Sequence, residues 1–172
     1  MLRAHEWTLV SVRAGVVGLF LGALLGSVAM AGPFEDAGSA HVRGDYASEF
    51  KLLAPLAAAG NPDAQYNLGV LYNKGLGVPK NYTAALQWYR KAVSQGNALA
   101  RLSLGVMYAT GQGVRQDYLQ ARVWFILAVE GIPESDATHH ATAVDYRDRV
   151  AAHLSAAQIA EAKKRSREWR PD

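Results

Sequence analysis

The stretch LGVLYNKGLGV at residues 68–78 recurs as LGVMYATGQGV at residues 104–114. A shift of 36 positions aligns residues 61–93 with residues 97–129, and 14 of these 33 pairs are identical. A period in the mid-thirties with apolar residues at helical spacing is typical of two-helix units that stack on one another. The repeat therefore predicts an all-α protein, an α-solenoid of antiparallel helix hairpins.

A fixed set of apolar and glycine positions is expected to hold each unit in shape. Asn61 can cap a first helix, and Gly69 inside that helix implies that another backbone approaches closely there. Gly75 suits the left-handed residue that ends a helix, and a second helix follows Asn81, with Trp88 filling the gap between units. The structural positions of the two units are Leu68, Gly69, Tyr72, Gly75, Gly77 and Trp88, and Leu104, Gly105, Tyr108, Gly111, Gly113 and Trp124.

The flanks of the two full units supply a further hairpin and a cap. We assign residues 34–60 to a degenerate N-terminal hairpin, residues 61–96 and 97–132 to the two repeats, and residues 133–172 to C-terminal capping helices. Ser155 and Gln158 have the spacing of a capping box. Residues 121–132 are apolar nearly all round, which predicts a helix covered on both sides. The cover is expected to come from the C-terminal region.

The pattern A-x-x-x-L-G-x-x-Y-x-x-G-x-G-V, followed by Y-x-x-A-x-x-W, resembles the Sel1-like repeat, a relative of the tetratricopeptide repeat. The resemblance covers residues 61–131 and extends weakly over residues 34–60. It implies a right-handed superhelix with a C-terminal capping helix, and a concave face that binds a protein or peptide. Exported bacterial proteins of this type act as adaptors, which implies a role in envelope signalling or assembly.

The first helix of each unit is expected to line the concave face, so residues there without a structural duty are candidate partner contacts. The candidates are Tyr66, Asn67, Val70, Asn73 and Lys74 in the first unit, and Leu102, Ser103, Val106 and Thr110 in the second. Those of the first unit suggest a polar groove with a cation, which suits an extended segment or a carboxylate. No cofactor is expected, and the formal net charge of +3 does not suggest a nucleic-acid partner.

Motifs that could carry catalysis or metal binding also have simpler structural explanations. Ser48 and Lys51 match the S-x-x-K spacing of penicillin-binding enzymes, so an enzyme directed at the cell wall or β-lactams is the alternative, although neither S-D-N nor K-T-G follows. His139 and His140 have no His, Asp or Glu three or four residues beyond them, which favours a surface pair over a metal site. The glycine-rich turn follows a helix rather than a strand and lacks GK[ST], unlike a phosphate-binding loop. We therefore expect no catalytic residues and no metal.

The N-terminus has the features of an export signal. Arg3 and Arg13 precede an uncharged run over residues 14–31, which ends in Ala29, Met30 and Ala31. This order of basic, apolar and small residues predicts a signal peptide over residues 1–31 and a periplasmic or secreted protein. The alternative is a membrane anchor formed by residues 14–31, which would make the protein a membrane-tethered spacer.

We predict cleavage after Ala31, because the small residues Ala29 and Ala31 suit the site at which signal peptides are removed. Mass spectrometry of the protein recovered from cells that produce it should show a chain that begins at Gly32. A chain that still begins near Met1 would support the membrane anchor instead.

Overall fold

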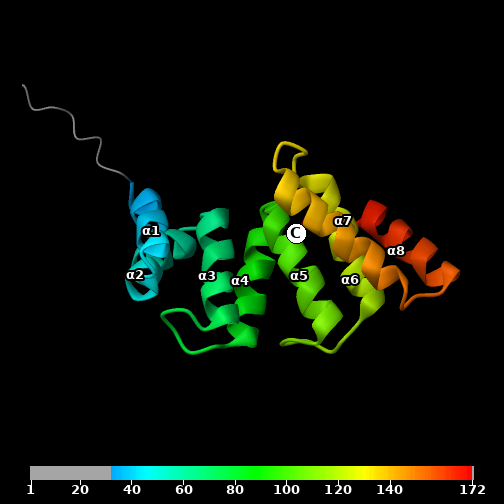
Figure 1. Ribbon diagram of the computed structural model, residues 1–172, viewed down its shortest axis with the longest axis horizontal. Coiled ribbons are helices and arrows are strands. Elements are labelled where there is room, and N and C mark those ends of the chain that lie inside the picture. Colours follow the sequence, from blue (N-terminus) through cyan, green and yellow to red (C-terminus); the bar gives the residue numbers. More distant parts are fainter. Residues whose placement is uncertain (1–31, 172) are drawn as a thin grey trace, which may run out of the picture. The chain divides into compact units, whose positions relative to one another are not determined.

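The computed structural model describes residues 32–171, and these residues form helices without strands. In chain order the helices are α1 (Pro33–Val42), α2 (Tyr46–Ala58), α3 (Pro62–Lys74), α4 (Tyr82–Ser94), α5 (Ala98–Thr110), α6 (Tyr118–Gly131), α7 (Ala137–Ala151) and α8 (Ala156–Glu168). Consecutive helices form the hairpins α1–α2, α3–α4 and α5–α6, and each hairpin packs on the next (Figure 1). The predicted solenoid of helix hairpins is confirmed.

The predicted signal segment, residues 1–31, lies outside the described residues. Within residues 32–171, no helix combines the length and the apolar character that crossing a membrane requires.

Side-chain caps and left-handed glycines set the ends of the helices. The Asn61 side chain accepts a hydrogen bond of 2.8 Å from the backbone N–H of Ala64 at the start of α3, and Gly75 ends that helix with a φ of 74°. Ser155 and Gln158 form the reciprocal capping box of α8. Each such cap satisfies an N–H group that the helix leaves unpaired, which is worth about 1 kcal/mol. These predictions from the sequence are confirmed.

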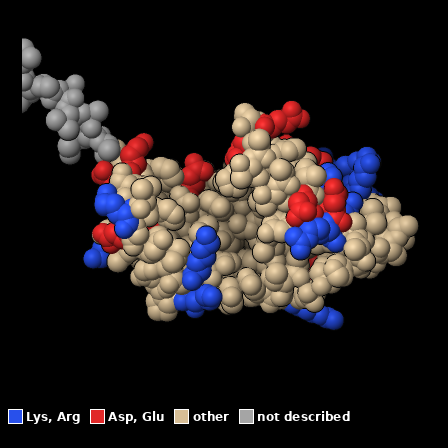
Figure 2. All heavy atoms as spheres, viewed as in Figure 1, with Lys and Arg blue, Asp and Glu red and all other residues tan. Residues whose placement is uncertain are grey.

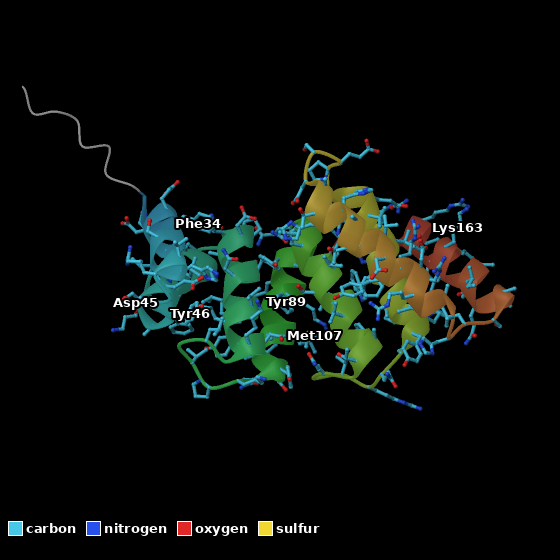
Figure 3. The ribbon with its side chains drawn as sticks, viewed as in Figure 1. Phe34, Asp45, Tyr46, Tyr89, Met107 and Lys163 are labelled. Atoms are coloured by element: carbon cyan, nitrogen blue, oxygen red, sulfur yellow. The ribbon has the colours of Figure 1, made fainter. Side chains whose placement is uncertain are left out.

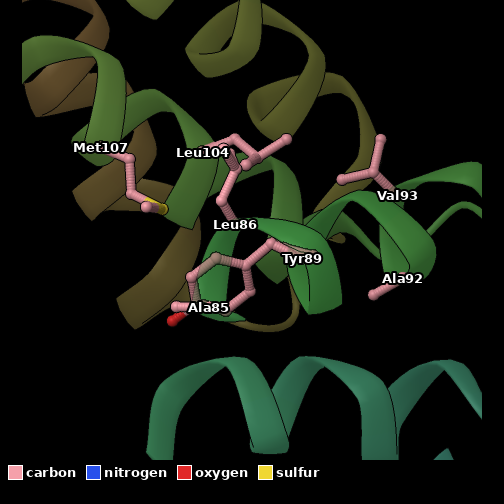
Figure 4. Packing of buried hydrophobic residues seen from close by; sticks show 8 residues of the cluster. Ala85, Leu86, Tyr89, Ala92, Val93, Leu104 and Met107 are labelled. Carbon is pink, nitrogen blue, oxygen red and sulfur yellow. The ribbon is translucent and has the colours of Figure 1, made fainter. Parts of the chain in front are cut away.

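Each repeat hairpin is built around a glycine of its first helix and an aromatic ring of its second helix. A Cβ atom on Gly69 would lie 2.5 Å from Cδ1 of Tyr89, and Gly105 faces the ring of Phe125 in the same way. The sequence led us to expect another backbone at these glycines, and that expectation is wrong. The absent side chain instead makes room for the ring of Tyr89, which is only 2% exposed and packs in one cluster with Met107 of α5 (Figure 4).

Close backbone approach occurs instead at the second glycine of each loop. Gly77 has a φ of 68°, and a Cβ atom there would lie 2.5 Å from the carbonyl group of Tyr46. Gly113 meets the backbone of Tyr82 in the same way, at 2.9 Å. Tyr46 and Tyr82 are the first residues of α2 and α4, the second helices of the preceding hairpins. The loop glycines therefore bring each repeat into contact with the hairpin before it.

Two tryptophans and α8 fill the remaining gaps between units. Trp88 packs against the buried cluster shared by α1, α2 and α3, and Trp124 packs against the cluster of α4 and α5. Helix α6 contacts α5, α7 and α8, and the buried Ala162 of α8 packs against its far side. The Trp169 ring lies edge-on to that of Trp124, with centroids 5.9 Å apart. The prediction that the C-terminal region covers the all-apolar helix is confirmed.

We expect Gly69→Ala to lower the free energy of unfolding by about 1–3 kcal/mol, because the added methyl group and the Tyr89 ring would occupy the same space. Gly38→Ala in α1 is the matched control. A Cβ atom on Gly38 has nothing within 4 Å, so the gain in helix propensity should stabilise the protein by up to about 1 kcal/mol. Urea unfolding of both variants measures the difference. Equal effects at the two glycines would contradict the ring contact.

Stability should also fall at alkaline pH because Tyr89 is buried. Burial raises the pKa of its phenol above the usual value, against a smaller lowering by the hydroxyl of Ser103. The unfolded chain releases this proton near a pH of about 10, before the folded protein does, so stability is present below that pH and is lost as pH rises above it. Tyr89→Phe, which introduces the residue of the equivalent position Phe125, should reduce the drop in melting temperature between pH 9 and pH 11. An unchanged drop would show that Tyr89 is not its source.

Candidate functional site

Two grooves open in the array, one beside its first hairpin and one beside its third hairpin. The C-terminal groove, of about 230 Å³, lies among α5, α6 and α7 and is lined by Val106, Ala109, Thr110, Tyr118, Phe125, Tyr146, Arg149, Val150 and His153. The N-terminal groove, of about 240 Å³, lies among α1, α2 and α3 and is lined by Phe34, Ala37, Gly38, His41, Glu49, Leu53 and Asn67. We call the surface formed by α1, α3, α5 and α7, with both grooves, the inner face.

Two of the predicted partner contacts lie together in the C-terminal groove. Val106 is half-buried, and Thr110 is exposed at the end of α5, where its hydroxyl donates a hydrogen bond of 2.8 Å to the Val106 carbonyl. The floor of the groove is apolar, because Phe125 and Val150 are buried. A side chain that entered the groove would therefore meet an apolar surface.

Aromatic rings and a cation stand beside these residues. The rings of Tyr118 and His153 are stacked, with centroids 4.2 Å apart and planes 9° from parallel. The guanidinium carbon of Arg149 lies 6.0 Å from the Tyr146 ring centroid, and Arg149 also pairs with Asp145 at 3.4 Å. Aromatic walls beside an exposed cation suit an apolar side chain that has a carboxylate nearby.

Tyr66, Val70 and Ser103 lie between the two grooves. The Tyr66 ring is 6.0 Å from that of Tyr89, and Tyr66 and Val70 both pack against the buried cluster of α4 and α5. Burial raises the pKa of Tyr66, and the neighbouring hydroxyl of Ser103 lowers it by a smaller amount. These candidates therefore contribute to the packing between repeats as well as to the surface.

The remaining candidates do not share one site. Asn67 lines the N-terminal groove, whereas Asn73 and Lys74 lie in the last turn of α3 and line neither groove. Leu102 is 8% exposed and belongs to the core formed with α6 and α7. The prediction that Leu102 is free to contact a partner is therefore wrong, because α7 covers this part of α5. The residues that were expected to form one polar groove in the first unit thus lie at separate places.

Most of the groove residues were missed from the sequence, among them the aromatic and charged side chains of the C-terminal groove: Tyr118, Tyr146, Arg149 and His153. Tyr118 is the tyrosine of the pattern Y-x-x-A-x-x-W in the second repeat, and the other three residues follow the last repeat. Helix α7 carries no recognisable repeat, so nothing in the sequence aligns its residues with those of α5. The apolar positions of α7 could have shown which side of this helix is buried. They could not have shown which residues of α5 and α6 pack against that side.

The motifs for catalysis and metal binding have structural partners. Asp45 caps α2 by accepting a hydrogen bond of 3.1 Å from the backbone N–H of Ser48. Hydrogen bonds from the Ser48 side chain and backbone lower the pKa of the Asp45 carboxyl group. Lys51 is exposed, and His139 pairs with Asp136 at 2.8 Å. Over residues 32–171, no three His, Cys, Asp or Glu side chains are placed to hold a metal ion together.

Comparison with known proteins locates the same repeats. The Sel1 repeat family model matches residues 62–97 and 98–131. A 54-residue part of the chain is 39% identical to the ERAD-associated E3 ubiquitin-protein ligase component HRD3A of Arabidopsis thaliana, covering 31% of this chain and 8% of that protein.

Two solved structures share the fold. One is c5321, a protective antigen of uropathogenic Escherichia coli strains with an SLR fold. It is similar to this chain with a TM-score of 0.69 and 28% sequence identity, and the match covers 79% of this chain and 28% of that chain. The other is a Sel1 repeat protein from Oxalobacter formigenes. Its TM-score is 0.56 and its sequence identity is 29%, and the match covers 75% of this chain and 59% of that chain. The chain thus spans less than two thirds of each of these relatives. Residues 62–131 thus match the Sel1 repeat twice, and residues 32–171 share the helical fold of these two structures.

Proposed function

We propose that the protein is an exported scaffold that binds a protein or peptide partner along its inner face, in envelope signalling or assembly. The observation that carries this proposal is the C-terminal groove. There the predicted contacts Val106 and Thr110 lie beside Tyr146 and Arg149, which offers apolar, aromatic and charged contacts at one open place. Such a combination is common where proteins bind peptides.

The sizes of the grooves favour an extended segment over an enclosed small molecule. Each groove measures about 230–240 Å³, below the roughly 300–1,000 Å³ that is usual for small-molecule sites. The grooves lie in different hairpins of the array, so a segment that ran along the inner face could contact both. In the view of Figure 2, charged side chains are scattered over a surface that is formed largely by other residues.

The export part of the proposal depends on the N-terminal sequence. The basic, apolar and small-residue order of residues 1–31 supports a signal peptide. The helical scaffold of residues 32–171, with its two matches to the Sel1 repeat, supports a binding role in the compartment that the chain reaches. The alternative is a membrane-tethered spacer. The mass of the mature N-terminus distinguishes it from an exported protein.

We expect Asn67→Lys combined with Thr110→Lys to reduce recovery of the partner at least tenfold after cross-linking in cells that naturally produce the protein. Each lysine would place a long charged side chain in a groove. Thr83→Lys with Gln87→Lys, at exposed positions of α4, adds the same charge and should leave recovery unchanged. Quantitative mass spectrometry compares the captured proteins. Equal capture by the two folded double variants would place the binding surface elsewhere.

A further inference from the structure

A glutamate occupies a position where both repeats have alanine. The shift of 36 residues aligns Glu49 of α2 with Ala85 and Ala121, which are 0% exposed. The Glu49 side chain is itself only 6% exposed. Removing a carboxylate from water is costly unless other groups compensate for it. The first hairpin therefore buries a charge at a place where the repeats need only packing.

One oxygen of this carboxylate has a partner within the fold. His41 Nδ1 lies 2.9 Å from Glu49 Oε2 and joins the end of α1 to α2. The other oxygen, Oε1, accepts no hydrogen bond from residues 32–171, and it is not among the side-chain atoms sealed from solvent without a partner. Whatever the charge of the imidazole, Oε1 is left as an acceptor, and Glu49 lines the N-terminal groove.

One turn after Glu49, the first hairpin has a smaller side chain than the two repeats have. Leu53 occupies the position of Tyr89 and Phe125, whose rings pack on Gly69 and Gly105 in the two repeats. Leu53 lines the N-terminal groove together with Asn67 and with Phe34 of α1, which is labelled in Figure 3. The groove thus combines a buried carboxylate, a side-chain amide and an aromatic ring.

The charge of this part of the chain favours a cationic occupant. Residues 32–74 hold three Lys and Arg against five Asp and Glu, whereas residues 75–171 hold thirteen Lys and Arg against eight Asp and Glu. The negative charges in the first part include Asp36 and Asp63 as well as Glu49. A positively charged side chain is therefore attracted to this part of the inner face.

We propose that the N-terminal groove binds the guanidinium group of an arginine side chain of the partner. The inference rests on the proposed function, in which the partner lies along the inner face. The planar guanidinium group can donate to both Glu49 Oε1 and the Asn67 amide oxygen, and it can stack on the ring of Phe34. A lysine ammonium group is a point charge that cannot stack in this way, so the groove selects arginine.

The test is a titration of the ¹⁵N-labelled full-length protein with n-butylguanidinium, followed by NMR. We expect saturable shifts of the backbone amides of Gly38, Leu53 and Asn67. Glu49→Gln should weaken binding at least tenfold, because an amide cannot replace the carboxylate charge. n-Butylamine should bind at least threefold more weakly than n-butylguanidinium.

Two further variants separate binding from folding. Glu49→Ala introduces the residue that both repeats have at this position, so it should stay folded and still lose binding. Glu161→Gln removes a carboxylate from α8 and should bind the probe as the unchanged protein does. The proposal is overturned by shifts that do not saturate, by equal binding to folded Glu49→Gln, or by equal affinity for n-butylamine. Partner capture is measured separately, so loss of the guanidinium site alone would leave the proposed scaffold function standing.

Discussion

The aromatic ring of each second helix rests on a glycine of the first helix, and the rest of the array depends on this contact. Tyr89 on Gly69 and Phe125 on Gly105 let the two helices of a hairpin approach with a whole ring between them. Burying a ring of this size removes roughly 150–250 Å² from water. The loop glycine Gly77 then brings the hairpin against the backbone of the unit before it. The missing side chains of Gly69 and Gly77 thus determine how closely the two helices of the hairpin pack and how closely the hairpin packs on the unit before it.

The surfaces that suit a partner lie where the chain departs from this arrangement. In the first hairpin Leu53 replaces the ring and Glu49 replaces alanine, and both residues line the N-terminal groove. At the other end, α7 meets α5 without a repeat sequence and contributes Tyr146 and Arg149 to a second groove. The middle of the inner face follows the repeat most closely, and there Tyr66 is taken up by packing. Regular units build the scaffold, and their irregular neighbours provide chemical variety.

Prediction from sequence succeeded where the physics is local. Asn61 caps α3 because its side chain reaches an N–H group three residues away, and Gly75 ends the helix because only glycine adopts a positive φ without strain. Prediction failed at Gly69. A glycine inside a helix shows that another group comes close, but it does not show whether that group is a backbone or a ring. The answer lies on Tyr89, twenty residues later.

The amino-acid pattern alone was enough for the two Sel1 repeats, the helix ends and the need for a C-terminal cover over α6, since each follows from periodicity or from neighbours along the chain. Which residues share a groove was settled only by packing between distant helices. Val106 and His153 line one groove, Asn67 and Glu49 line another, and Leu102 belongs to the core. The physical reason is that the exposure of a side chain depends on which helix packs over it. Helix α7 has no repeat pattern from which its packing on α5 could be predicted.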